Sequence, residues 1–215
     1  MKRGPEPTDL PAVAGFVAAV HGEHDPFSHV FAASEEHRQA HGAGCEVYPT
    51  GSGRLLGVLT RVLGAKRILE VGCGLGYSAL WLAWGSAPDG RVETVEQDEE
   101  HARLARVHFK EAGVGDRVQV LLGPARDVLP GLSGPYDFTF VDSDWVDYPA
   151  LLEHFIRVLR QGGLLASSNL WPATYAPGLS GLAEVAEYRR RLLEEPALFT
   201  TLLTGGPALS VKVTS

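Results

Sequence analysis

The stretch RILEVGCGLGYS, residues 67–78, decides the fold of this chain. An apolar run that ends at Val71 predicts a short buried strand, and helix-forming sequence resumes at Ser78. Between them stand three glycines at alternate positions, Gly72, Gly74 and Gly76. Glycine lets the backbone turn sharply and approach a ligand that a Cβ atom would block. We therefore predict a strand, a glycine loop and a helix that together bind a nucleotide-like ligand.

Two glutamates flank this predicted pocket. Glu70 stands where the strand becomes the loop, and Glu96 ends the next strand-like run, RVETVE. A carboxylate at the second position can accept both hydroxyl protons of a ribose. NAD enzymes share the glycine loop, but a sulfonium ligand with an amino acid end also needs an acceptor for its ammonium group. Glu70 would supply that acceptor, although a solvated strand end explains it equally well.

Strands and helices alternate along the chain after the first strand. The pattern predicts βαβ units in a mostly parallel sheet with helices on both faces. The predicted strands are 67–71, 91–96, 118–122, 136–141 and 164–167, with a terminal hairpin built from 198–203 and 208–213. The predicted helices are 78–84, 99–112, 126–129, 149–159 and 182–194. Before the sheet, residues 1–45 predict a helical N-terminal extension, and residues 46–215 form the ligand-binding domain.

A further helix should begin near Thr50 and lead into the first strand. Its apolar residues recur at helical spacing, which predicts a buried face made by Leu55, Val58, Leu59 and Val62. Trp81 and Trp84 occupy the apolar helix after the glycine loop and are expected in the core.

Composition restricts the possible partners. The chain has 215 residues and a net charge of −7, which disfavours broad attraction to nucleic acid or to an anionic membrane surface. Two cysteines, Cys45 and Cys73, make no disulfide framework and suit a reducing cytoplasm. Prolines interrupt the first twenty residues, so neither a signal peptide nor a membrane span is expected. These features favour a cytoplasmic protein that acts on a small molecule.

From about Val47 onward the chain resembles the S-adenosylmethionine-dependent O-methyltransferases of the catechol and caffeoyl-CoA type. The resemblance rests on GAKRILEVGCGLGYSAL, TVEQDEEHARLAR, GVGDRVQVLLGPARDVLP, PYDFTFVDSD and LRQGGLLASSNLW. It implies a Rossmann-like class I methyltransferase sandwich, with a seven-stranded, mostly parallel sheet and one antiparallel strand. It also implies a homodimer and a small hydroxyl-bearing methyl acceptor.

The same resemblance implies roles for individual residues. The backbone at Val47 and Gly72, with Gly74, Ser78 and Glu70, would hold the methionine end of S-adenosylmethionine. Glu96 would bind the ribose, Ala125 would lie against the adenine, and Asp142 would sit near the methionine end. Ser78 on its own is equally explained as a helix N-cap.

The chain departs from this family at the metal site. The resemblance implies a divalent cation held by an Asp after the fourth strand and an Asp-Asn pair after the fifth. Asp142 and Asn169 fit the outer positions, but Ser168 replaces the middle carboxylate. A hard cation such as Mg²⁺ relies on carboxylate charge, so we expect a weak or absent metal site. Asp142 and Asp144 are the candidates for a catalytic role, and Asp144 could also rebuild the cation site with Asn169 or else be a polar residue of a loop or helix start.

A second departure concerns the base. The lysine that this family carries three residues after the metal Asp is replaced here by Trp145, whose indole cannot accept a proton. Trp145, Trp171 and Tyr175 would then either frame an aromatic acceptor or pack over the sheet edge or at a subunit interface. Five histidines within the first 41 residues are expected to lie in a solvated helical region, although His24 or His29 could cap the site.

Several functions remain open on the sequence. O-methylation of a small, possibly aromatic hydroxyl is the leading hypothesis. The alternatives are N-methylation of a small molecule, and a non-catalytic module that binds S-adenosylmethionine or S-adenosylhomocysteine. An NAD-dependent oxidoreductase is a weaker alternative, since the sequence offers no helix start suited to a pyrophosphate.

Overall fold

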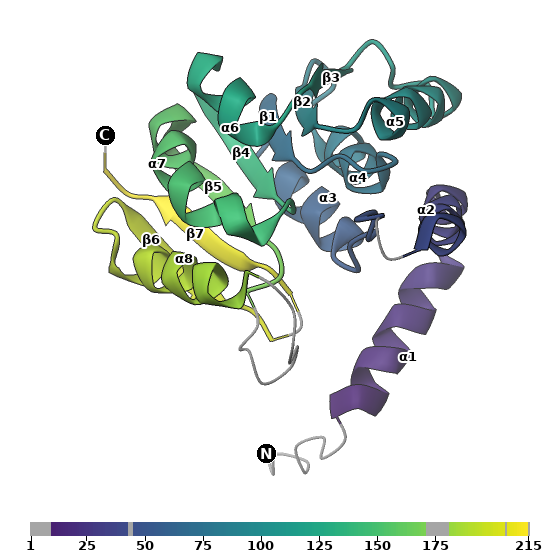
Figure 1. Cartoon of the computed structure of the whole chain (residues 1–215), viewed down its shortest axis with the longest axis horizontal. Coiled ribbons are helices and arrows are strands. Elements are labelled where there is room, and N and C mark those ends of the chain that lie inside the picture. The colour runs from purple at the N-terminus through teal and green to yellow at the C-terminus, as the bar shows by residue number, and fades with distance from the viewer. Residues whose placement is uncertain (1–9, 43–44, 171–180, 205, 215) are drawn as a thin grey trace.

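The fold is built on one seven-stranded sheet with strand order β3-β2-β1-β4-β5-β7-β6 (Figure 1). The structure is a computed structural model that describes residues 10–42, 45–170, 181–204 and 206–214. The strands are β1 (Arg67–Val71), β2 (Arg91–Glu96), β3 (Val118–Leu122), β4 (Tyr136–Val141), β5 (Leu159–Ser167), β6 (Leu198–Leu202) and β7 (Ala208–Lys212). β7 is antiparallel to both of its neighbours, and the other paired strands are parallel. The predicted mostly parallel sheet with one antiparallel strand is confirmed.

Helices cover both faces of this sheet. They are α1 (Leu10–Glu23), α2 (Ser28–His41), α3 (Gly53–Val62), α4 (Tyr77–Gly85), α5 (Glu99–Glu111), α6 (Ala125–Val128), α7 (Tyr148–Val158) and α8 (Leu182–Glu194), with the short 3₁₀ helices η2 (Leu129–Gly131) and η3 (Trp145–Asp147). In Figure 1, α3, α4 and α5 lie on one side of the sheet, and α6, α7 and α8 lie on the other. α1 extends away from this body (Figure 1).

Alternation along β1 divides the core into two layers. Ile68 packs into the cluster beneath α3, α4 and α5, whereas Leu69 and Val71 pack into the cluster beneath α7 and α8. Successive strand residues point to opposite faces, so a strand buried on both sides reads as a continuous apolar run. The central strands are therefore fixed from both faces, and their carboxyl ends are held at one edge of the sheet.

The segment before α2 is anchored to the helix that follows the glycine loop. The Tyr77 hydroxyl donates to a carboxylate oxygen of Asp25 at 2.6 Å. The rings of Phe27 and Trp81 meet edge to face, with centroids 5.2 Å apart. These contacts place α2 beside the loop that the sequence identified as the ligand site.

The predicted buried face of α3 is wrong at Val58 and Val62, whereas Leu59 packs partly buried against the core as predicted. Val58 and Val62 are 50% and 79% exposed, and the buried positions are Gly53, Leu56, Gly57 and Thr60. Small residues explain the difference, because α3 packs closely on α4. A Cβ atom on Gly53 would lie 2.4 Å from a ring carbon of Trp81. Close helix approach, rather than hydrophobicity, selects the buried face here.

The two tryptophans of α4 differ in burial. Trp84 was expected in the core, but its side chain is 51% exposed, and the Arg61 guanidinium lies 5.7 Å from its ring centre. Trp81, in contrast, is buried as predicted. Cys45 and Cys73 are both free and buried. No helix in the described part of the chain is both long and apolar enough to span a membrane.

Candidate active site

The glycine loop lies at the carboxyl ends of β1, β2 and β4, and its glycines have different roles. Gly72 has φ +97°, and a Cβ atom there would lie 2.0 Å from the Asp142 carbonyl oxygen. Gly76 has φ +94°, and its Cβ would lie 2.6 Å from the Phe109 ring. These two glycines are required by protein packing. Gly74, with φ +52°, is the member of the three whose Cβ would make only an ordinary contact, 3.7 Å from Val47.

Glu96 closes the loop from the end of β2. One of its carboxylate oxygens accepts the backbone N–H of Gly74 at 2.7 Å, and the other accepts that of Asp98 at 2.9 Å. The side chain is 7% exposed. A carboxylate offers about four lone-pair sites, so each oxygen can accept one more donor. The position predicted for a ribose-binding acid therefore holds a fixed carboxylate with spare acceptor capacity.

Glu70 differs from both interpretations offered by the sequence. It is neither a solvated strand end nor open to a ligand, because its side chain is completely buried. The Thr94 hydroxyl, opposite Glu70 in the β1–β2 register, donates to Oε2 at 2.5 Å. Oε1 has no hydrogen-bond partner among the described residues. Burial raises the pKa of this carboxyl to about 8, although the hydrogen bond from Thr94 opposes the shift. Glu70 is thus predominantly neutral at pH 7.

A small pocket opens beside the loop, where β4 and β5 end. Its volume is about 170 Å³, and it is lined by Tyr48, Pro49, Thr50, Gly51, Ser52, Asp142, Ser168, Asn169 and Gly206. Sequence reasoning missed the wall formed by residues 48–52, for which the polar run directly after Val47 is the available signal. The pocket brings together the three positions that the resemblance assigned to a metal site.

Asp142 is the carboxylate of this pocket. Asn169, which has a left-handed φ of +59°, donates its side-chain N–H to Oδ1 of Asp142 at 2.7 Å. Burial raises the pKa of the Asp142 carboxyl to about 7, while a hydrogen bond with Ser168 lowers it. A carboxylate that titrates near neutral pH in a pocket is suited to accept a proton from a bound ligand.

These side chains do not fit a carboxylate-rich magnesium site. Among the described residues that line the pocket, Asp142 is the single carboxylate, Ser168 contributes a hydroxyl, and the Asn169 amide directs its nitrogen to Asp142. Mg²⁺ prefers several oxygen ligands with carboxylate charge to offset its dehydration. The arrangement therefore supports proton transfer by Asp142 better than metal coordination.

The remaining predicted residues are scattered around this edge of the sheet. Asp144 is exposed and caps η3, accepting the backbone N–H of Val146 at 3.1 Å. Trp145 packs against the core cluster beneath α7 and α8. Ser78 is the second residue of α4, whose N-cap is Gly76, so the N-cap interpretation of Ser78 is wrong. Ala125 begins α6. Trp171 and Tyr175 lie outside the described residues.

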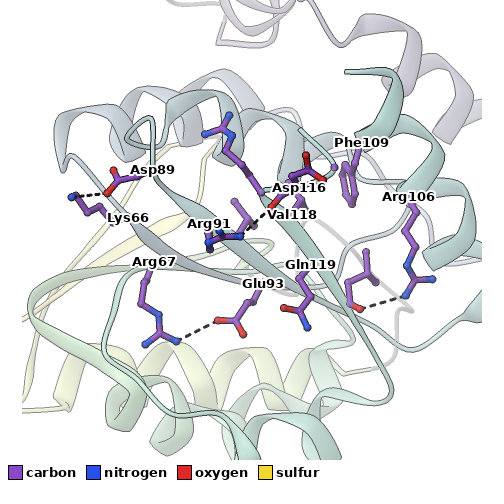
Figure 2. A pocket seen from close by; sticks show the side chains of 14 residues that line it. Lys66, Arg67, Asp89, Arg91, Glu93, Arg106, Phe109, Asp116, Val118 and Gln119 are labelled. Atoms are coloured by element: carbon purple, nitrogen blue, oxygen red, sulfur yellow. Dashed lines mark hydrogen bonds and ion pairs between the residues drawn. The ribbon is translucent and has the colours of Figure 1, made fainter. Parts of the chain in front are cut away.

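A larger groove lies elsewhere, beside the amino ends of β1 and β2 (Figure 2). Its volume is about 760 Å³. Two pairs of its charged side chains bond one another, because Lys66 lies 2.9 Å from Asp89 and Arg67 lies 3.4 Å from Glu93, and Arg91 donates to the Asp116 carbonyl oxygen at 3.1 Å. Ligands of open α/β sheets bind at the carboxyl ends of the strands. The small pocket beside the glycine loop is therefore the better candidate for the site.

Comparisons with known proteins agree with this geometry. The sequence model of a family described as O-methyltransferase matches residues 34–200. A catechol O-methyltransferase of Mycobacterium tuberculosis is 39% identical over 155 residues, which is 70% of this chain and 70% of that protein. A cofactor-bound crystal structure of a protein from MTB has a TM-score of 0.79 and 31% identity, covering 98% of this chain and 99% of that one. The O-methyltransferase TomG from Streptomyces achromogenes, in complex with SAM, has a TM-score of 0.72 and 29% identity, with coverages of 86% and 89%.

Proposed function

The chain belongs to the O-methyltransferase family, and we propose that it methylates a hydroxyl group of a small aromatic molecule without a tightly bound metal ion. S-adenosylmethionine-dependent O-methyl transfer is the reaction of this family, and relatives and structural neighbours support it for this chain. The aromatic acceptor, the independence from metal and the roles of individual residues are our proposal.

The cofactor is proposed to lie along the glycine loop. Glu96 accepts the ribose hydroxyls. Each of its carboxylate oxygens accepts one backbone N–H and can accept a further donor, which supports this role. The backbone at Val47 and Gly72, with Gly74 and the Ser78 hydroxyl, holds the methionine end, and Ala125 lies against the adenine. Glu70 acts as a positioning residue, because its buried neutral carboxyl fixes the end of β1 through Thr94.

Asp142 is proposed as the base for the acceptor. The acceptor hydroxyl enters the pocket beside Asp142, Ser168 and Asn169 and gives its proton to the Asp142 carboxylate. Its oxygen attacks the methyl carbon of the sulfonium, a C–O bond forms, the C–S bond breaks, and sulfur leaves as a neutral thioether. In-line positioning of the two reactants supplies much of the rate enhancement. The observation that carries this proposal is the position of the Asp142 carboxyl in the pocket wall, where Asn169 donates to it at 2.7 Å and burial raises its pKa to about 7.

The comparison of Asp142→Asn with Asp144→Asn tests this role. General base catalysis typically contributes 10²- to 10⁴-fold, so kcat should fall by roughly that factor in Asp142→Asn. Asp144→Asn should keep kcat within about twofold, since Asp144 caps η3 from an exposed position. Both variants should bind S-adenosylmethionine with little change in Kd. Equal kcat values in the two variants would reject Asp142 as the base.

A planar acceptor and metal independence are tested together. Tyr48 lines the pocket and is 65% exposed, so its ring is available to a flat ligand. The similarity to a protein named catechol O-methyltransferase supports catechols as the first acceptors to assay. Turnover of a catechol should survive EDTA. Loss of turnover with EDTA and its recovery with Mg²⁺ would show that a cation is required after all.

A cytoplasmic homodimer completes the proposal. On α1, the apolar side chains of Phe16, Val17 and Val20 are 69%, 42% and 39% exposed, which favours a second protein surface against this helix. The two free, buried cysteines are consistent with a reducing compartment. Light scattering of the full chain and of Phe16→Glu would test the dimer, because the substitution should shift the mass toward the monomer.

A further inference from the structure

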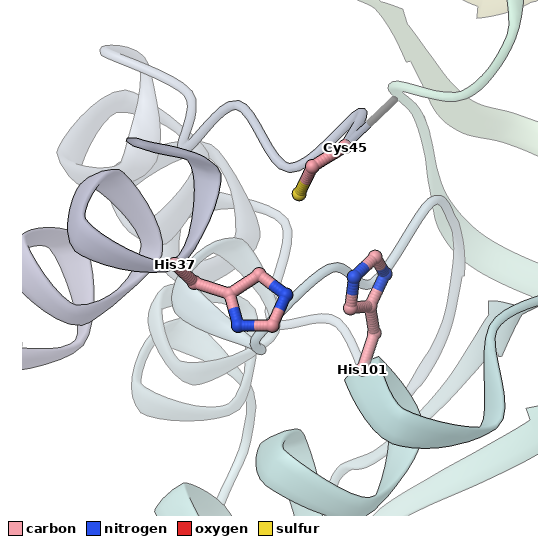
Figure 3. A group of neighbouring side chains, drawn as sticks. All are labelled: His37, Cys45 and His101. Carbon is pink, nitrogen blue, oxygen red and sulfur yellow. The ribbon is translucent and has the colours of Figure 1, made fainter. Parts of the chain in front are cut away.

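Three side chains from distant parts of the sequence converge beside the glycine loop. His37 comes from α2, Cys45 from the segment that precedes Val47, and His101 from the first turn of α5. Their ligand atoms all lie within 4.8 Å of one another, and Figure 3 shows the three side chains directed toward a common point. None of them has a role in the methyl transfer described above.

Their chemistry matches a transition metal. Two imidazoles and a thiolate are the ligand types of tetrahedral Zn²⁺ sites, whereas Mg²⁺ requires oxygen. We propose that His37, Cys45 and His101 bind one zinc ion, with water in the fourth position. Zn–N and Zn–S bond lengths place tetrahedral ligand atoms about 3.3 to 3.6 Å apart, so two atoms at the 4.8 Å limit would move about 1 Å closer when the ion binds.

The surroundings of the cluster favour a bound cation. Cys45 is 7% exposed, which keeps the thiol away from bulk solvent. The carboxylates of Glu96 and Asp98 each lie 3.9 Å from Nδ1 of His101 and add negative charge beside the ion.

Zinc would tie the N-terminal segment to the cofactor site. The ion would join α2 and the chain before Val47 to α5, at the side of Glu96. It would therefore stabilise the folded chain by an amount that increases with the logarithm of its affinity, and it would fix two segments that border the proposed cofactor site. This zinc site stands on its own residues and does not depend on the identity of the methyl acceptor.

Cobalt spectroscopy tests the site directly. The full chain is freed of metal with a chelator and titrated with Co²⁺, which gives a thiolate-to-cobalt charge-transfer band and strong visible bands in a tetrahedral site. Wild type should show both signals, and Zn²⁺ should displace them stoichiometrically. Any Co²⁺ at Asp142 and Asn169 would have oxygen ligands and give no thiolate band, so the proposed catalytic pocket cannot mimic this result.

Variants assign the ligands. Cys45→Ser should abolish the thiolate band, and Cys45→Ser and His37→Ala should each weaken zinc binding at least 100-fold. The matched controls are His29→Ala, an exposed histidine on the same helix, and Cys73→Ser, the other buried thiol; both should keep the thiolate band and the wild-type affinity for zinc. Zinc should raise the Tm of wild type but not of Cys45→Ser. Absence of a thiolate band in wild type, or its persistence in Cys45→Ser, would overturn the proposal, whether or not methyl transfer is observed.

Discussion

Replacing Glu70 by glutamine should remove a large pH dependence of stability. The ordinary pKa of the Glu70 carboxyl is 4.5, and burial raises it to about 8 in the folded protein. The folded state therefore binds the proton more tightly, so the free energy of unfolding decreases as pH rises from about 4.5 to 8. A shift of this size corresponds to about 3 to 5 kcal/mol at 1.36 kcal/mol per pKa unit. Glutamine keeps the shape of the neutral acid but cannot ionise.

Urea unfolding at a series of pH values provides the assay. Below pH 5 the two proteins should have similar free energies of unfolding, and by pH 8 Glu70→Gln should be more stable than wild type by about 3 to 5 kcal/mol. Glu111→Gln, at an exposed position of α5, is the control and should follow the wild-type curve. If Glu70→Gln runs parallel to wild type across this range, Glu70 ionises normally and its assignment as a neutral buried group is wrong.

Three further substitutions test the loop and the pocket. Glu96→Gln should weaken S-adenosylmethionine binding about 10- to 100-fold by calorimetry, from the loss of charged hydrogen bonds, while the exposed Glu99→Gln should not; equal affinities would exclude a ribose role. Gly72→Ala should lower the free energy of unfolding by about 2 to 5 kcal/mol because its Cβ would lie 2.0 Å from a carbonyl oxygen, whereas Gly131→Ala, with open space around it, should be nearly neutral. Ser168→Asp should bind Mg²⁺ at least tenfold more tightly than wild type in a titration. If the Mg²⁺ affinity does not increase, the missing carboxylate at position 168 is not the sole reason why the pocket lacks a strong magnesium site.

The sheet could be predicted because its information is local. The bounds of β1 to β4 are those predicted from the sequence, because glycine, proline or charged residues mark the ends of each strand-like run. The buried face of α3 could not be predicted in the same way. Hydrophobicity pointed to Val58 and Val62, but the contact with α4 depends on the absence of side chains at Gly53 and Gly57.

The site was predictable only where sequence order fixes position. Glu96 and Asp142 follow strands, so the sheet brings them to one edge. The state of a carboxyl depends on burial by distant segments, and for that reason the neutral character of Glu70 could not be inferred. The grouping of His37, Cys45 and His101 likewise depends on how α2 packs beside α5. The separation of these residues along the sequence does not predict that packing.

The most direct test of the proposed reaction is methyl transfer by the metal-free protein. Wild type treated with EDTA is incubated with a catechol and with S-adenosylmethionine that carries a deuterated methyl group, and the product is examined by mass spectrometry. We predict a deuteromethyl ether of the catechol, formed at least 100-fold faster than by Asp142→Asn. A product that forms only when Mg²⁺ is added, or at equal rates in both proteins, would contradict a metal-independent transfer with Asp142 as its base.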